Sequence, residues 1–162
     1  MKQTQPKARL PIDGGKVRDD TLQQFVGYQL KRASNAVLND LASVLKPFEL
    51  RMITYTALVL IVDNPGMRQS QLADAMDVER PNLVVIIDEL ERREWIVRDK
   101  VASDRRAYAL RATLAGHHLY ERALKAVHAH EAALVNGIDP EALRTLSAVV
   151  LGIQKNAKRN DT

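Results

Sequence analysis

The sequence predicts a mostly α-helical fold that carries one small antiparallel β-hairpin. Apolar residues recur every three or four positions over most of the chain after residue 20, and this is the period of a helix with one buried face. Residues 96–98 and 107–111 instead have the pattern of short strands, with a period of two. Two closely spaced helical segments precede the hairpin. Together these observations predict a helix-turn-helix followed by a hairpin, with long helices at both ends of the chain.

The N-terminal part of the chain divides into an arm and a long helix. Residues 1–20 mix basic side chains with proline and glycine and show no apolar period, so we expect a flexible arm. From Thr21 the apolar positions follow a helical repeat up to Pro47, which predicts one helix over residues 21–46 with about seven turns. A helix of this length usually packs on more than its own domain.

The next segments predict two shorter helices. Residues 51–63 form a strongly apolar helical pattern that ends at turn residues 64–66. Met67 and Arg68 follow this turn and are candidates for a short third strand beside the hairpin. Residues 70–76 then give a short helical pattern with apolar side chains on one side, and only a few residues separate it from the next helix.

The segment 79–95 predicts the helix around which the rest of the chain is arranged. Pro81 suits a first helical turn, where a missing N–H costs nothing. One narrow apolar stripe repeats at i, i+3, i+4 and i+7, so a single face is expected to be buried. The stripe consists of Leu83, Ile86, Ile87 and Leu90. Two helices joined by about 3–4 residues make a helix-turn-helix, whose second helix enters the DNA major groove.

The other face of this helix has side chains that suit DNA. Arg80 and Asn82 can pair bidentately with guanine and adenine edges, and Val84 and Val85 can meet a thymine methyl group. An ordinary amphipathic helix with a proline start would carry the same stripe, but the preceding short helix favours a helix-turn-helix. The residues expected to contact DNA are Ser70, Gln71, Arg80, Pro81, Asn82, Val84, Val85, Asp104, Arg105 and Arg106.

The hairpin tip is the second part of the expected DNA surface. Residues 99–106 separate the two strand patterns, and residues 98–106 carry four basic against two acidic side chains. A charged tip of this kind can reach phosphates or a minor groove, although a solvated turn would have the same composition. Residues 48–111 are thus expected to form a winged helix-turn-helix domain.

The C-terminal part predicts two long helices. Thr113 is expected to cap a helix that runs to Gly137, and Asp139 with Pro140 is expected to start a last helix. A small winged domain cannot bury the apolar faces of these helices alone. A second copy of the chain is the economical partner, so residues 21–46 and 113–158 are expected to form the dimerisation region of a homodimer.

Several motifs in this order resemble the MarR family of winged-helix transcription regulators. The pieces that carry the resemblance are residues 71–73 (QLA), 84–93 (VVIIDELERR), 96–98 (IVR), 103–107 (SDRRA) and 110–116 (LRATLAG). Their order and spacing are more specific than any one piece, and the likeness covers roughly residues 21–158. One position departs, because the family usually has glycine after the recognition helix and this chain has Glu94. A left-handed conformation would strain Glu94, so the helix is expected to continue through Trp95 or the turn to be built differently.

The resemblance also implies a small-molecule effector site between the first long helix, the second helix and the start of the helix after the wing. Polar side chains run beside the apolar face of the first helix, and other polar side chains could approach from the second helix and from the helix after the wing. The candidates are Tyr28, Arg32, Asn35, Tyr55 and His118. Apolar walls with a few polar groups suit an aromatic acid or its coenzyme A thioester. Each residue has an alternative role, Arg32 as a surface or dimer-rim charge and the tyrosines as core rings.

The composition excludes several other classes of protein. The 162 residues suit a single domain, and the absence of cysteine removes disulfides, thiolate nucleophiles and cysteine-based metal sites. The longest apolar run, residues 57–62, is too short to cross a bilayer, and no apolar core of a signal peptide follows the N-terminal lysines, so a cytoplasmic protein without a membrane partner is expected.

Charge and motif content narrow the function further. The net charge of +4 permits a polyanionic partner, yet residues 68–111 hold nine basic and nine acidic side chains, so bulk charge does not establish one. The four histidines do not pair at i, i+4, and no phosphate-binding loop or nucleophile elbow occurs. We therefore expect no enzyme, no cofactor and no metal site. A winged helix that binds protein in place of DNA is the alternative, because fold does not fix function.

Overall fold

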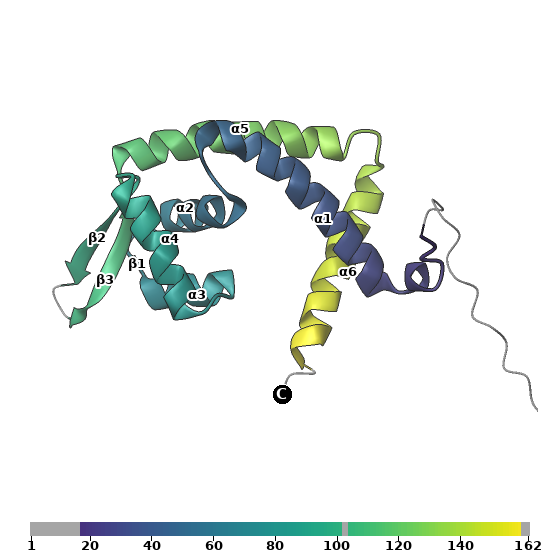
Figure 1. Cartoon of the computed structure of the whole chain (residues 1–162), viewed down its shortest axis with the longest axis horizontal. Coiled ribbons are helices and arrows are strands. Elements are labelled where there is room, and N and C mark those ends of the chain that lie inside the picture. The colour runs from purple at the N-terminus through teal and green to yellow at the C-terminus, as the bar shows by residue number, and fades with distance from the viewer. Residues whose placement is uncertain (1–16, 102–103, 160–162) are drawn as a thin grey trace, which may run out of the picture. The chain divides into compact units, whose positions relative to one another are not determined.

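The computed structural model describes residues 17–101 and 104–159 of the chain, and the side chains of residues 101–107, 158 and 159 lie outside this description. The chain forms two compact units, Met1–Val37 and Leu38–Thr162, and α1 runs across their boundary. The helices are η1 Leu22–Gln24, α1 Val26–Leu45, η2 Lys46–Phe48, α2 Met52–Asp63, α3 Gln69–Met76, α4 Arg80–Arg92, α5 Leu114–Leu134 and α6 Pro140–Arg159 (Figure 1). The strands are β1 Met67–Arg68, β2 Ile96–Val101 and β3 Asp104–Ala112.

The first helix begins later than the sequence predicts. A single helix from Thr21 is wrong, because Phe25 has an extended backbone with φ −102° and ψ 122°. The 3-10 helix η1 precedes this residue, and α1 starts after it at Val26. An apolar repeat alone does not reveal the break, since Leu22, Phe25 and Val26 all fit a continuous helical stripe.

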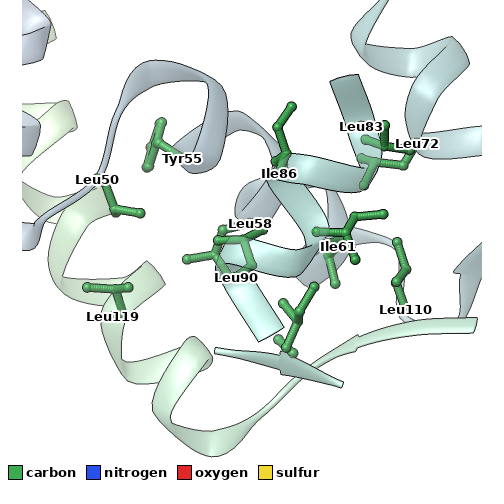
Figure 2. Close-up of a cluster of buried hydrophobic side chains, with 14 of the residues drawn as sticks. Leu50, Tyr55, Leu58, Ile61, Leu72, Leu83, Ile86, Leu90, Leu110 and Leu119 are labelled. Carbon is green, nitrogen blue, oxygen red and sulfur yellow. The ribbon is translucent and has the colours of Figure 1, made fainter. Parts of the chain in front are cut away.

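The core of the winged domain lies where α2, α4, α5 and the sheet meet. Figure 2 shows side chains of α2, among them Leu58 and Ile61, next to Leu90 of α4 in one buried cluster, and all three are fully buried. All four residues of the predicted apolar stripe of α4 are buried. Of its two leucines, Leu83 is 2% exposed and Leu90 is fully buried. Truncating a fully buried leucine to alanine typically costs about 2–5 kcal/mol, so this cluster fixes the position of α4.

The wing is a three-stranded antiparallel sheet with the order β1-β3-β2. The predicted third strand is confirmed, because Met67 pairs with Leu110 and Arg68 with Ala109. β2 and β3 extend further than the short strand patterns suggested, with Ile96 opposite Ala112 at the base of the hairpin. The expected tip of residues 99–106 is therefore largely strand, because paired backbone groups continue the ladder past the apolar positions.

The helix after the wing starts and ends with the predicted signals. The Thr113 hydroxyl accepts a hydrogen bond from the Gly116 N–H at 3.0 Å, and Gly137 has a positive φ of 79° beyond the end of α5. Asp139 caps α6 by accepting from the Ala142 N–H at 3.3 Å. Within residues 17–101 and 104–159, no helix has the length and apolarity needed to cross a bilayer.

The turn after α4 corrects the expectation for Glu94. The helix ends at Arg92, and Glu94 has the left-handed φ of 59° that the sequence analysis expected it to avoid. The Trp95 N–H donates to the Leu90 carbonyl at 3.0 Å, and the Glu94 N–H donates to the Glu91 carbonyl at 2.8 Å. These two bonds form a Schellman motif, which satisfies the last carbonyl groups of the helix and holds Glu94 in the strained conformation.

Candidate DNA-binding surface and effector site

The helix-turn-helix exposes the side chains that the sequence assigned to DNA. Residues 77–79 join α3 to α4, and Asp77 turns the chain with a left-handed φ of 52°. Val84 is 44% and Val85 65% exposed, which leaves two apolar side chains in water. The polar and proline positions of the same surface are exposed as well, and these are Ser70, Gln71, Arg80, Pro81 and Asn82. Because the stripe of α4 faces the core, this opposite face at the helix start can contact a partner.

Gln71 has a structural role besides its predicted contact with DNA. Its side-chain oxygen accepts a hydrogen bond from the Arg68 N–H at 2.8 Å, which caps the start of α3. The amide NH₂ of Gln71 is not used in this bond and stays available as a donor. A glutamine three residues into a helix is a known capping signal, so the pattern could have been found in the sequence.

Acidic residues on the C-terminal half of α4 are paired with arginines. Arg98 of β2 contacts Asp88 at 2.8 Å and also contacts Glu91. Arg51, which precedes α2, contacts Glu89. The hydrogen bond to Glu91 raises the pKa of the Arg98 guanidinium, so this arginine stays charged. These pairs connect α4 to the wing and to the start of α2, and they neutralise much of the charge of this half of the helix.

Three basic side chains of β1, α4 and β2 differ from these paired arginines. Arg68, Arg80 and Lys100 are exposed, and the ion pairs among the side chains that the structure describes do not include them. The total charge of residues 68–111 does not reveal these exposed cations, because it does not distinguish arginines that pair within the chain from those that do not. Arg68 and Lys100 are thus additional candidates for phosphate contacts.

The wing tip contains the three residues at the start of β3 that were predicted to contact DNA. The backbones of Asp104, Arg105 and Arg106 begin β3, but their side chains lie outside the described residues. Further along the hairpin, Arg111 donates to Asp99 at 2.7 Å, so this arginine is engaged within the wing.

The expected effector residues fall into the two compact units. Tyr28, Arg32 and Asn35 belong to the first unit, in which Arg32 pairs with Asp19 at 2.8 Å and the Tyr28 hydroxyl donates to the same carboxylate at 2.7 Å. Asn35 is exposed. Tyr55 and His118 belong to the second unit. The grouping of all five residues around one ligand therefore stays a prediction.

Within the second unit, Tyr55 and His118 have different surroundings. Tyr55 is 9% exposed and lies in the core, where burial and then the nearby Tyr120 raise the pKa of its hydroxyl. His118 is exposed and lines a cleft of about 480 Å³. The other residues along this cleft are Pro47, Phe48, Glu49, Trp95, Ala115, Leu119 and Arg122. Among the residues that the structure describes, no cluster of three or more metal-ligating side chains occurs.

The exposed start of α4, the short helix before it and the antiparallel sheet after it define a winged helix-turn-helix protein with a nucleic-acid-binding surface. The sequence pattern of the MarR family matches residues 51–108. The solved structure of the transcriptional repressor CouR bound to a 23-mer DNA duplex has 31% sequence identity and a TM-score of 0.82, and the match covers 86% of this chain and 99% of that one. The chain therefore belongs to the MarR family of winged helix-turn-helix transcriptional regulators.

A second solved CouR structure and one further regulator are also similar to this chain. CouR from Rhodococcus jostii bound to p-coumaroyl-CoA has 27% identity and a TM-score of 0.73, over 83% of this chain and 95% of that one. A putative transcriptional regulatory protein for the hcr operon of Thauera aromatica is 38% identical over 92 residues, or 56% of this chain. The match spans 55% of that protein's length. Family membership confirms the prediction of a transcription regulator and not an enzyme.

Proposed function

We propose that this chain is a homodimeric transcriptional repressor that binds a palindromic operator and leaves it when a small aromatic effector binds. The effector class is an aromatic acid or its coenzyme A thioester. Two solved CouR structures support this proposal, because one contains a DNA duplex and the other p-coumaroyl-CoA. Activation in place of repression depends on where the operator lies relative to the promoter.

The observation that carries the DNA-binding part is the exposed outer face of the first two turns of α4. Arg80, Asn82, Val84 and Val85 all point away from the buried stripe. Exposed valines at a helix start are unfavourable in water but can meet thymine methyl groups, and Asn82 can hold adenine by two hydrogen bonds. This combination is what reading a major groove requires, and it explains why apolar and polar side chains share this face.

Selection of bound duplexes from a random pool provides the test. The pool should yield an inverted repeat with half-sites about one helical turn, roughly 34 Å, apart. On the selected site, Asn82→Ala should lose on the order of 1–3 kcal/mol and relax the preference at one base pair of each half-site. If all site variants weaken equally, Asn82 only positions the protein and does not read sequence.

A pair of arginine variants separates phosphate contacts from general charge. Arg80→Ala should lower the slope of log affinity against log salt by about 0.9 for each lost phosphate contact. Arg92→Ala removes the same charge from the last turn of α4 and should leave the slope unchanged. The double variant of Arg105 and Arg106 should also flatten the slope. A parent protein that shifts no duplex at low salt would support the protein-binding alternative.

A further inference from the structure

Three hydrogen-bond donors in the first unit converge on a single carboxylate oxygen. The Tyr28 hydroxyl lies 2.7 Å, the Arg32 guanidinium 2.8 Å and the Gln23 amide 2.9 Å from Oδ2 of Asp19. The three donor groups are a hydroxyl, a guanidinium and an amide, and they share this one acceptor oxygen. An oxygen surrounded by three donors, one of them a cation, is in surroundings that favour a negative charge.

The local fold holds these donors in place before any ligand binds. Tyr28 and Arg32 stand at i and i+4 on α1, so their side chains share one face, and the guanidinium lies 5.9 Å from the centre of the tyrosine ring. The Gln29 side chain donates to the Gln23 carbonyl at 2.6 Å, which ties η1 to α1 across the extended Phe25. The break at the start of the first helix is thus part of how the site is built.

The electrostatics of the cluster favour an anion. The hydrogen bond from Tyr28 and then that from Gln23 hold the pKa of the Asp19 carboxyl below its ordinary value, so Asp19 is ionised at neutral pH. The contact with Tyr28 and then that with Asp19 raise the pKa of Arg32. A carboxylate or phosphate oxygen from another molecule could replace Oδ2 of Asp19 without changing the donors.

We propose that Gln23, Tyr28 and Arg32 form a subsite for the anionic group of the effector, and that Asp19 occupies this subsite as an internal competitor when the effector is absent. This inference rests on the proposed function. The chemical class of the ligand group is a carboxylate or a phosphate oxygen. Binding of the effector then releases the segment that contains Asp19, which links occupancy of the site to a change at the N-terminal end of α1.

The accessibility of the pair makes such an exchange feasible. The side chain of Arg32 is 61% exposed, so a ligand can reach its guanidinium while Asp19 is still bound. Exposed ion pairs contribute little to stability, so replacing Asp19 by a second anion costs little.

Matched variants of two neighbouring carboxylates test the proposal. Asp19→Asn removes the competitor, whereas Asp20→Asn removes the same charge one residue away, from a carboxylate paired with Arg18. Isothermal titration would measure the binding of three probes, namely p-coumarate, coenzyme A and p-coumaroyl-CoA. The first carries a carboxylate, the second phosphates without the aromatic acid, and the third both phosphates and the aromatic group.

The expected result is a selective gain for Asp19→Asn. If Asp19 fills the subsite in nine molecules of ten, its removal should tighten the apparent Kd of at least one probe about tenfold, since only the open fraction binds. Asp20→Asn should match the parent, and Arg32→Ala or Tyr28→Phe should weaken binding. Binding to Asp19→Asn without measurable binding to the parent also supports the proposal.

A second measurement uses the parent protein, so it does not depend on whether a variant folds. In the parent protein, ¹³C NMR titration of the Asp19 carboxyl should give a pKa below the ordinary value, and a saturating probe should move it back towards that value. Equal affinities of the two Asn variants, or no binding of any probe to Asp19→Asn, would overturn the internal-competitor model. If affinities are equal and a probe still releases DNA, the proposed function stands and only this inference fails.

Discussion

Glu94 pays a conformational penalty that follows from its place in the turn after α4. Its φ of 59° lies in the left-handed region, where the Cβ of an L-residue approaches the following carbonyl oxygen. Only glycine avoids this contact. The Schellman bonds of Glu94 and Trp95 hold the turn shut, so the surrounding structure decides the conformation against the local preference.

Replacing Glu94 with glycine should therefore stabilise the protein. We expect Glu94→Gly to raise the free energy of unfolding by about 0.5–1 kcal/mol, because relief of the strain exceeds the extra entropy of glycine in the unfolded chain. Glu94→Ala keeps the Cβ and should give no gain. Urea denaturation of the two variants measures the difference. Equal stability of Gly and Ala at this position would show that the strain is absent.

Single residues also show where sequence reasoning stops at this scale. The buried stripe of α4 and the exposure of Asn82 follow from helical periodicity, and both predictions are confirmed. The intrinsic backbone preference of Glu94 predicts that it avoids a left-handed conformation, and two hydrogen bonds override this preference. The ion pair between Arg32 and Asp19 joins residues thirteen positions apart across a break in the helix, and no periodic pattern reports such a pair.

At the scale of elements, the wing and α5 are joined by a close approach of two backbones. The Thr113 N–H donates to the Trp95 carbonyl at 3.0 Å, and the Thr113 hydroxyl donates to the Glu94 carbonyl at 2.6 Å. Gly116 in the first turn of α5 lies against the same place, since a Cβ there would stand 1.9 Å from the Trp95 oxygen. The angle between the recognition helix, the wing and α5 depends on this contact.

Adding a methyl group at Gly116 should disrupt this junction. Gly116→Ala forces the backbone of Trp95 or the start of α5 to move, and we expect a loss on the order of 3 kcal/mol in the free energy of unfolding. Gly27→Ala is the matched control, because nothing lies within 4 Å of a Cβ at that position. Thermal and urea unfolding would compare the two. Equal stability of both variants would mean that the close approach does not exist in solution.

The elements themselves were predicted to different degrees. The apolar helix α2, the capped starts of α5 and α6 and the third strand of the wing follow from periodicity and capping residues, and the structure confirms them. The start of α1 and the length of the wing strands do not. Backbone pairing extends β2 and β3 past their apolar residues, and the extended Phe25 interrupts a repeat that looks continuous.

On the scale of the whole molecule, α6 carries an apolar stripe that the described part of the chain leaves partly exposed. None of its described side chains is buried, and Leu146 and Val149 on its apolar stripe are at least half exposed. A chain in water seldom leaves a helix of this length uncovered, because each exposed apolar side chain forgoes about 1.5–3 kcal/mol of burial. The residues of the predicted effector site likewise come from both compact units.

We expect a second copy of the chain to cover this stripe in a homodimer. Light scattering at micromolar concentration should give about twice the chain mass of 18.2 kDa. Leu146 lies on the apolar stripe of α6, and Leu146→Glu should shift the protein towards monomer, because a charge in the interface would lack a partner. Leu151→Glu introduces the same charge about 140° round the helix, off the stripe, and should stay dimeric. A monomeric parent would exclude the dimer, and with it the reading of an inverted repeat by two recognition helices.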